Sequence, residues 1–468
     1  MHRFLTLLGM LLVILLACER HHDNTGASLA FSSDTIHFDT VFTSIGSTTR
    51  ELRVRNISGA AVIVDRIFLG GGNDSAFRLN VDGESTSDVH NVKIEAHDSL
   101  FIFIDAFIDP DNADSPFIVA DSIIFETNGN NQKVYLLAWG QDIILVKNMT
   151  ISPGSWTSKK PYLVYGRCLV DTLSSLTIEE GVRIYFHRQA SLVVAGSLIV
   201  NGSLDAPVVF ASDRLESVYR DVPGQWDGIM FLNTSRANRI SYSEICNSVI
   251  GIKIGEPYDV AIFPDLKILN TKIYHSSVAG ISAISANIQA ANCIIAHCGS
   301  NCIDLQAGGD YSFIYCTIDN WWEYGFRQTP SLFVKENSDF PLLSASQLNL
   351  NLGNSVLYGN TNSELDIESL SGQYSGNYFF DHCLLKIDTI TSLFWTPDRF
   401  HSTIVNKDPL FIDEFNLDFR PDTLSPLIDS GAEIYTADYP SDIRGVTRDT
   451  GEKPDIGAFE RIPGDKNK

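Results

Sequence analysis

The chain has 468 residues, a hydrophobic content of 44% and a formal net charge of −23 at pH 7. This length and hydrophobicity allow a sizeable core and indicate two or more domains. The negative charge excludes nucleic acid as a partner, because phosphate binding needs clustered lysine and arginine. A polyanionic glycan would also be repelled unless calcium or a local basic patch intervened, so neutral glycans or proteins are the expected partners.

The first 17 residues are organised like a secretion signal. A charged start precedes an apolar block from Phe4 to Leu16, which is too short to span a bilayer. The segment LLAC ends this block at Cys18 and resembles the lipobox of bacterial lipoproteins, where cleavage frees the cysteine for acylation. The resemblance implies lipidation of Cys18 and a place in the cell envelope, at the outer membrane or cell surface. The alternative is an ordinary signal peptide whose cysteine forms a disulfide.

Residues 18–28 are polar and lack an apolar period, which predicts a flexible tether. From 29 to 142, short runs of alternating polarity such as Glu51–Arg55 are separated by turn clusters, which predicts an all-β sandwich. The order FDTVFTSIGS, RVRNIS, IFLGGG, FRLNV and IFETNGNNQ resembles the immunoglobulin-like domains of the Hydin type in bacterial surface proteins. That resemblance implies a spacer or adaptor role.

A repeat begins after residue 147. The segments YSEICNS, NTKIYHS, NCIIAHC, YCTIDNW and NSVLYGN each place one apolar residue at the same point: Ile245, Ile273, Ile295, Ile318 and Leu357. The basic period of about 22 residues, without helical periodicity, predicts one coil of a parallel β-helix per repeat over residues 147–420. Asn270, Asn292 and Asn354 all lie three positions before the repeated residue, so we expect a ladder of stacked side chains at a turn.

The segment SLTIEEGVRIYFHRQASLVVAGSLIVNGSLDAPVVFAS, followed by WDGIMF, resembles the opening coils of the right-handed, pectate-lyase-like β-helix superfamily in secreted bacterial proteins. The segments DPLFIDEFNLDFRPDTLSPLIDSGA and YPSDIRGVTRDTGEKPDIGAFE look like its closing segment, which we assign to residues 421–468. Asp442, Arg444 and Arg448 are expected to cap the open end of the helix there. Asp-Ser/Thr-aliphatic triplets resemble a glycosylation acceptor of Bacteroides-type bacteria, which fits a lipoprotein of the Bacteroidetes type.

Pectate lyases hold calcium with several aspartates and remove a sugar proton with a basic residue. Asp304, Asp310 and Asp319 lie on successive predicted turns and form a candidate calcium site, with solvated turn carboxylates as the alternative. Polygalacturonases use paired aspartates, but at the nearest match these positions are Ser300 and Asn301. The sequence therefore predicts no catalytic residue, and calcium is the one cofactor it suggests.

Trp321, Trp322 and Tyr324 follow a predicted strand, at the point where loops leave a β-helix. Sugar faces stack on indole and phenol rings, so these residues form a candidate glycan-binding platform. The alternative is ordinary packing beneath the insertion that follows them.

Cys293 and Cys316 occupy the same position in neighbouring repeats, two residues before the repeated apolar residue. They are therefore the candidate disulfide, with two stacked free thiols as the alternative.

Together these patterns predict a lipid-anchored, all-β protein with an immunoglobulin-like sandwich followed by a right-handed parallel β-helix that binds polysaccharide. Two competing functions remain at this stage. One is a polysaccharide lyase or hydrolase. The other is an adhesin or structural protein with another surface protein as its partner.

Overall fold

The computed structural model describes residues 29–256, 263–336, 347–369, 376–389 and 396–462. The predicted leader, Cys18 and the tether lie outside the described residues. The described part contains strands and the short 3-10 helices η1 (Gly72–Asp74), η2 (Ser217–Tyr219), η3 (Pro397–Arg399), η4 (Glu414–Asn416) and η5 (Glu433–Tyr435). None of these described helices is long and apolar enough to cross a membrane. The chain divides into two compact units, Met1–Asp142 and Ile143–Lys468.

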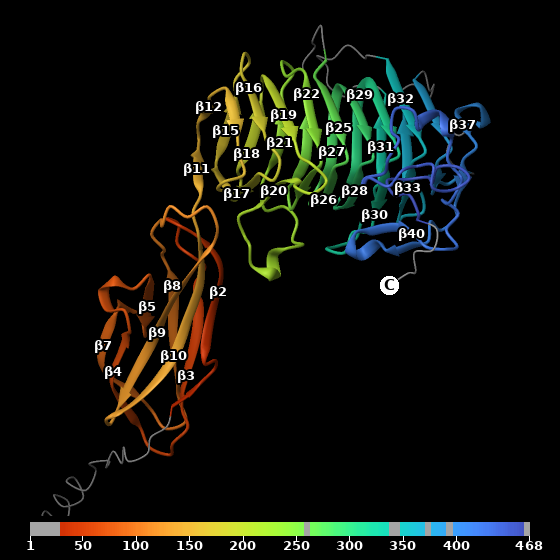
Figure 1. Ribbon diagram of the computed structural model, residues 1–468. Helices are drawn as coiled ribbons and strands as arrows, with labels where there is room; N and C mark the ends of the chain where they lie inside the picture. The colour runs from red at the N-terminus through yellow and green to blue at the C-terminus, as the bar shows by residue number, and fades with distance from the viewer. Residues whose placement is uncertain (1–28, 257–262, 337–346, 370–375, 390–395, 463–468) are drawn as a thin grey trace, which may run out of the picture. The chain divides into compact units, whose positions relative to one another are not determined.

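The first unit is a β-sandwich of two five-stranded sheets (Figure 1). One sheet has the order β1 (Leu29–Phe31), β3 (Arg50–Asn56), β8 (Ser99–Ala106), β5 (Phe77–Val81), β6 (Glu84–Thr86). The other has the order β2 (Thr35–Phe42), β10 (Asn130–Gln141), β9 (Phe117–Thr127), β4 (Val62–Leu69), β7 (Asp88–Ile94). Alternation along each strand buries one face, as where Leu52 is buried beside exposed Glu51. The two buried faces meet, with the rings of Phe38 and Phe77 5.5 Å apart.

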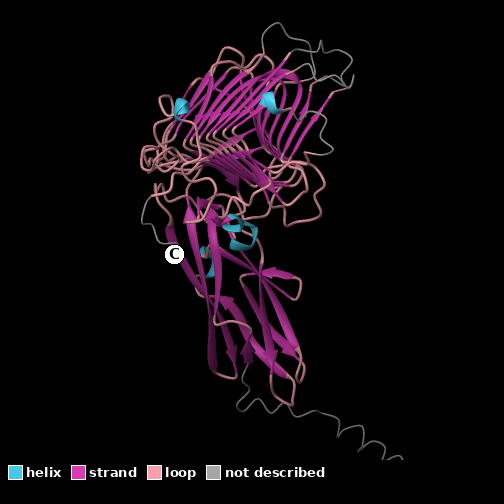
Figure 2. Ribbon diagram, turned by 90° about the vertical axis from the view of Figure 1, so that its right-hand side faces the viewer, coloured by secondary structure: helices cyan, strands magenta, loops and turns pink. Residues whose placement is uncertain are grey.

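The second unit is a right-handed parallel β-helix, as the sequence predicted, and its strands stack side by side in Figure 1. Strands and connecting loops make up nearly all of both units in Figure 2. An 11-stranded parallel sheet contains, in order, β11 (Ile144–Lys147), β14 (Tyr162–Tyr165), β17 (Arg183–Phe186), β20 (Val208–Ser212), β23 (Ser243–Cys246), β26 (Lys272–Ser276), β28 (Ile294–Cys298), β30 (Thr317–Asn320), β33 (Val356–Gly359), β36 (Leu384–Leu385) and β38 (Ile404–Val405).

A second, 17-stranded sheet forms the rest of each coil. It contains, in order, β12 (Thr150–Ile151), β13 (Gly154–Trp156), β15 (Arg167–Val170), β16 (Ser175–Ile178), β18 (Ser191–Val194), β19 (Ser197–Asn201), β21 (Gly228–Phe231), β22 (Asn238–Ser241), β24 (Ile250–Ile254), β25 (Asp265–Leu269), β27 (Ala279–Ala291), β29 (Asn301–Ile314), β31 (Leu332–Lys335), β32 (Leu348–Gly353), β34 (Leu365–Glu368), β35 (Asn377–Asp381) and β37 (Phe400–His401). A short antiparallel pair, β39 (Phe411–Asp413) and β40 (Asp418–Pro421), follows the coils.

The repeated apolar residues form one buried column in the 11-stranded sheet. Ile245, Ile273, Ile295, Ile318 and Leu357 pair in register from coil to coil, and none of the five is accessible to solvent. Each coil therefore contributes one side chain to a continuous core. The sequence alignment that predicted the repeat gives the same register as the structure.

The predicted asparagine ladder forms in part. Asn270, Asn292 and Asn354 all adopt left-handed backbone conformations, with φ of 49°, 52° and 46°, which asparagine tolerates better than most residues. Asn292 donates a hydrogen bond from Nδ2 to Oδ1 of Asn270 over 3.0 Å. Asn354 instead bonds to the backbone of Ala432, because Tyr315 occupies this turn position in the coil between Asn292 and Asn354.

The closing segment covers a side of the helix, so the predicted role as an end cap is wrong. Outward-facing Ile294 and Ala296 of β28 pack against Phe419 and Phe459. Further contacts join outward-facing residues of β33 and β36 to the segment at Leu427. Strand β28 carries apolar side chains on both its inner and its outer face. The outer face must be shielded from water, which explains why the closing segment packs along the side of the helix and not over its end.

Arg448 fixes the closing segment to the coils. Its side chain is buried, its guanidinium carbon lies 3.5 Å from the centre of the Tyr315 ring, and Nη2 donates to Oδ1 of Asn292 over 2.8 Å. Nη1 of Arg448 lies 3.5 Å from Oε2 of Glu460, which is buried as well. The charged motif seen in the sequence is therefore a buried polar network between the segment and the helix.

Candidate functional site

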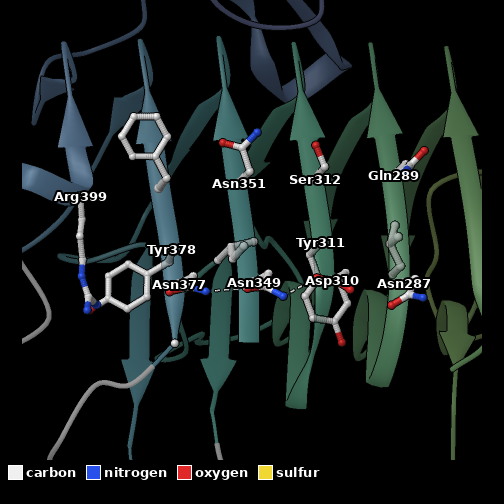
Figure 3. Close-up of a pocket in the computed structure, with 14 residues that line it drawn as sticks. Asn287, Gln289, Asp310, Tyr311, Ser312, Asn349, Asn351, Asn377, Tyr378 and Arg399 are labelled. Atoms are coloured by element: carbon white, nitrogen blue, oxygen red, sulfur yellow. Dashed lines mark hydrogen bonds between the residues drawn. The ribbon is translucent and has the colours of Figure 1, made fainter. Parts of the chain in front are cut away.

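A groove with a volume of about 790 Å³ crosses the outer face of β27, β29, β32 and β35 (Figure 3). Two rows of side chains in register line it, Asn287, Asp310, Asn349 and Asn377 in one row and Gln289, Ser312, Asn351 and Phe379 in the other. We call this site the amide groove. Residues between the two rows, such as Tyr311 and Tyr378, are buried, so strand alternation alone explains why the polar groups face outward.

Hydrogen bonds link the first row from strand to strand. Asn349 donates from Nδ2 to Oδ1 of Asp310 over 2.5 Å, and Asn377 donates from Nδ2 to Oδ1 of Asn349 over 2.9 Å. An amide has two donor hydrogens and an acceptor oxygen, so each asparagine in this row has capacity left for a ligand. The bonds also hold the side chains in place before a ligand arrives.

The groove is close to neutral. Among the described residues that line it, Asp310 is the only carboxylate and Arg399 the only guanidinium. Arg399 lies over the buried ring of Tyr378, 3.8 Å from its centre. Phe379 presents an exposed ring at the same end, with 41% of its surface accessible. The site thus combines neutral hydrogen-bonding groups with an aromatic surface.

The described residues of the groove do not include the pair of groups that glycoside hydrolysis needs. That reaction uses two carboxyl groups, and the described lining supplies only Asp310. Tyr311 could serve as a base only as a phenolate, but burial raises its pKa well above the usual range. Its hydroxyl donates to the carbonyl oxygen of Gly308 over 2.9 Å. The arrangement can bind a polar ligand, and the lining residues that the structure describes supply no acid–base pair.

The predicted aromatic residues lie in a second, smaller pocket of about 430 Å³, the tryptophan pocket. Trp321, Trp322 and Tyr324 line it together with His275 and His297. The rings of Trp322 and Tyr324 are 5.4 Å apart and tilted by 54°. Their planes do not form one flat platform, so a sugar could stack on only one of these rings at a time.

The predicted calcium ligands are not brought together. Asp304 and Asp310 lie in the two halves of β29, whereas Asp319 lies on β30 in the other sheet. Asp304 accepts a hydrogen bond from Gln306, and Asp319 is fully buried with its pKa raised well above the usual range by burial and by the charge of Glu364. A calcium ion takes six to eight oxygen ligands. The calcium site predicted from the sequence is therefore wrong as a three-aspartate site.

Cys293 and Cys316 are buried neighbours in adjacent coils, as their spacing indicated, but both are free thiols. Burial raises the pKa of the Cys316 thiol, and its hydrogen bond with Cys293 raises the pKa further. The Cys316 thiol therefore stays protonated, and both buried side chains pack as small apolar groups. The structure therefore has two stacked free thiols, the alternative to the predicted disulfide.

Sequence reasoning missed the amide groove. The signal was present in the segment QLNLNLG at 347–353, where leucine and asparagine alternate with the period of a strand. The alternation shows that Asn349 and Asn351 face away from the core. It does not show which residues of other coils lie beside them.

Fold and site define the class of the molecule as an all-β protein with a right-handed parallel β-helix and an open polar groove on one of its sheets. A family model described as right handed beta helix region matches residues 227–392. This match covers β27, β29, β32 and β35, the strands that form the groove. No curated protein sequence matches the chain.

Two solved structures are similar to parts of the chain. One is a protein of unknown function from Porphyromonas gingivalis W83, with 7% identity, a TM-score of 0.19, and coverage of 27% of this chain and 60% of that chain. The other is a family 123 glycoside hydrolase from Clostridium perfringens, with 8% identity, a TM-score of 0.18, and coverage of 27% of this chain and 31% of that chain. The chain thus spans less than two thirds of either protein, and neither similarity bears on its fold or function.

Proposed function

We propose that this protein binds neutral polysaccharide in the amide groove. The observation that supports the proposal is the hydrogen-bonded row of Asp310, Asn349 and Asn377 on neighbouring parallel strands, beside the exposed ring of Phe379. Sugar hydroxyls both donate and accept hydrogen bonds, as side-chain amides do. The ring adds the flat apolar surface on which a sugar face stacks.

The groove suits a polymer better than a single sugar. Its first row repeats once per strand, and strand neighbours lie about 4.8 Å apart, so four strands span about 14 Å. A chain of similar sugar units laid across the strands would meet the same kind of group at each step. The net charge of −23 favours a neutral chain over a polyanionic one.

The proposed location of the protein follows from the segment that precedes Cys18. The apolar block before Cys18 supports a lipoprotein of a Bacteroidetes-type bacterium, anchored by acyl chains at the outer membrane or cell surface. The two-sheet sandwich supports an immunoglobulin-like spacer between that anchor and the β-helix. In this arrangement the membrane partner is lipid, and the partner of the groove is an extracellular glycan.

Binding to a polysaccharide panel tests the proposal. The full-length chain is titrated with laminarin, galactomannan, xylan, starch and polygalacturonate, while the absorbance of unsaturated products is followed. We expect binding to a neutral member of the panel, a loss of at least tenfold in the double variant Asn349→Ala with Asn377→Ala, and no product. Each good hydrogen bond lost at an uncharged site costs about 1 kcal/mol, which makes a tenfold loss the minimum for two residues.

The matched control is Trp321→Ala with Trp322→Ala, which changes the tryptophan pocket and leaves the groove intact. If this variant loses binding and the asparagine variant does not, the ligand site is the tryptophan pocket and the proposal for the amide groove fails. Unsaturated product released by the wild-type chain would show a lyase instead. Absence of binding to every member of the panel would also overturn the proposal.

A further inference from the structure

Two histidines and one aspartate converge beside the end of β35. Oδ1 of Asp381 lies 2.8 Å from Nδ1 of His382 and 2.7 Å from Nδ1 of His401. One candidate ligand atom from each of the three residues lies within 4.8 Å of the others. In the described part of the chain, no other group of three histidine, cysteine or acidic side chains reaches this arrangement.

The β-helix brings these residues together in two different ways. Asp381 and His401 pair in register, Asp381 at the end of β35 and His401 on β37 in the next coil. His382 occupies the left-handed turn position that holds asparagine in other coils, with φ of 49°. Histidine adopts this conformation less readily than asparagine and more readily than most residues, and unusual backbone positions concentrate at functional sites.

A neighbouring tyrosine holds the carboxylate in place. Tyr435 in the closing segment donates its hydroxyl hydrogen to Oδ2 of Asp381 over 3.1 Å, on the side away from the histidines. Oδ2 of Asp381 is thus held by Tyr435, while Oδ1 faces two imidazoles.

We infer that Asp381, His382 and His401 form a binding site for a zinc-class transition-metal ion. Two imidazole nitrogens and one carboxylate oxygen are a common protein donor set for zinc and its neighbours in the first transition row. Tyr435 then has the role of an outer-shell partner that orients a ligating carboxylate. Calcium and magnesium are disfavoured because they take oxygen ligands.

The geometry needs only a small adjustment to admit a metal. Zinc lies about 2.0 to 2.2 Å from nitrogen and oxygen ligands, so tetrahedral coordination separates ligand atoms by about 3.3 Å. The present N–O distances of 2.7 and 2.8 Å must therefore widen by about 0.5 to 0.6 Å to reach that separation. The side chains of His401 and His382 would each have to move, and 63% and 24% of them, respectively, are accessible to solvent. The exposure of His401 also leaves the remaining coordination positions open to water or to a ligand.

The site adjoins the amide groove. The ring of His401 is stacked at 6.5 Å from the ring of Phe379, which lines the groove. Metal binding goes beyond the proposed glycan binding and does not depend on it, since no residue of the donor set lines the groove. The two proposals can therefore fail separately.

Isothermal titration of the full-length chain with zinc chloride tests the inference. All proteins carry His21→Ala and His22→Ala, because this histidine pair in the predicted tether could itself bind zinc. We expect one zinc ion per chain, at least tenfold weaker binding in His401→Ala, and about 10- to 100-fold weaker binding in Tyr435→Phe. Calcium chloride should give no comparable binding. Cobalt bound at the same site should give visible absorption that His401→Ala removes.

His187→Ala is the matched control. His187 also pairs with a carboxylate through Nδ1, at 2.7 Å from Asp213, but without a second histidine. Zinc affinity should be unchanged in this variant. The inference is overturned if the parent chain binds no zinc, if His401→Ala binds zinc as tightly as the parent, or if calcium binds equally well. Because His401 is exposed, its substitution is expected to leave the fold intact.

Discussion

The two sheets of the β-helix have opposite outer faces, although both are built from stacked parallel strands. In the 11-stranded sheet, Ile294 and Ala296 face outward and the closing segment covers them. In the 17-stranded sheet, Asn349 and Asn351 face outward and line an open groove. The backbone is similar on both sides, so the polarity of the outward residues decides which face the chain covers and which face remains available to a ligand.

The largest expected effect concerns the covered face. Phe419 is 1% exposed and packs beneath the closing segment. Phe419→Ala should lower the free energy of unfolding by about 3 to 5 kcal/mol, through lost burial and the cavity left behind. Urea-induced unfolding followed by circular dichroism measures the change.

Leu424→Ala is the control for that experiment, because Leu424 lies five residues after Phe419, within the closing segment, but is 83% exposed. Its effect should stay within about 0.5 kcal/mol. Equal effects of the two substitutions would mean that the closing segment does not stabilise the helix, and the contrast between the two faces would lose its energetic basis.

A smaller effect on stability is expected from the protonation of His297, which is buried on the same face of the helix. Nε2 of His297 lies 3.0 Å from the carbonyl oxygen of Glu414, and the ring packs near Phe419. Burial, with a smaller contribution from neighbouring His275, lowers the pKa of His297 to about 4. His275 in turn faces Asp221 at 3.8 Å. Since an unfolded histidine has a pKa of about 6.5, the unfolded chain binds more protons between these values, and stability is lost as pH falls from about 6.5 towards 4.

His297→Gln should therefore reduce the acid-side loss of stability, by up to about 3 kcal/mol for a shift of this size. Urea unfolding of both proteins at pH 7 and at pH 4.5 measures the difference. Burial and the charge of Asp455 raise the pKa of Glu460 to about 8, which favours folding at low pH, but this contribution is common to both proteins and cancels. Identical pH dependence in the two proteins would contradict the burial of His297 beneath η4 and β40.

The smallest effect on stability is expected at the open face. Asn349 is partly exposed, and its side chain bonds only to Asp310 and Asn377 among the described residues. Asn349→Ala should lower the free energy of unfolding by no more than about 1 kcal/mol, the net value of one or two exposed hydrogen bonds. A loss as large as that of Phe419→Ala would show that the row is structural and would weaken the case for a binding role.

The repeat and the core were predictable from the sequence, because the stacked residues recur within each coil. Ile245 and Ile273 could be aligned from local pattern alone, and the structure pairs them. The covered face was less accessible to prediction. Arg448 bonds to Asn292 across 156 positions of the chain, and no local pattern reports such a contact.

The site was predicted less well for the same reason. Asp304, Asp310 and Asp319 were grouped by their spacing, but coils have unequal lengths, and the three residues fall on two strands of different sheets. Asp381 and His401 meet because one coil brings β37 beside β35. Grouping residues across coils requires the register of each strand pair, and insertions of variable length hide that register in the sequence.

Hydrogen–deuterium exchange tests the contrast between the two faces most directly. The full-length chain is compared with and without the neutral polysaccharide of the panel that binds it. We expect the polysaccharide to slow exchange in peptides from β27, β29, β32 and β35 and to leave exchange unchanged in β40 and the closing segment. Slower exchange confined to the closing segment or the tryptophan pocket, with none in those four strands, would contradict it.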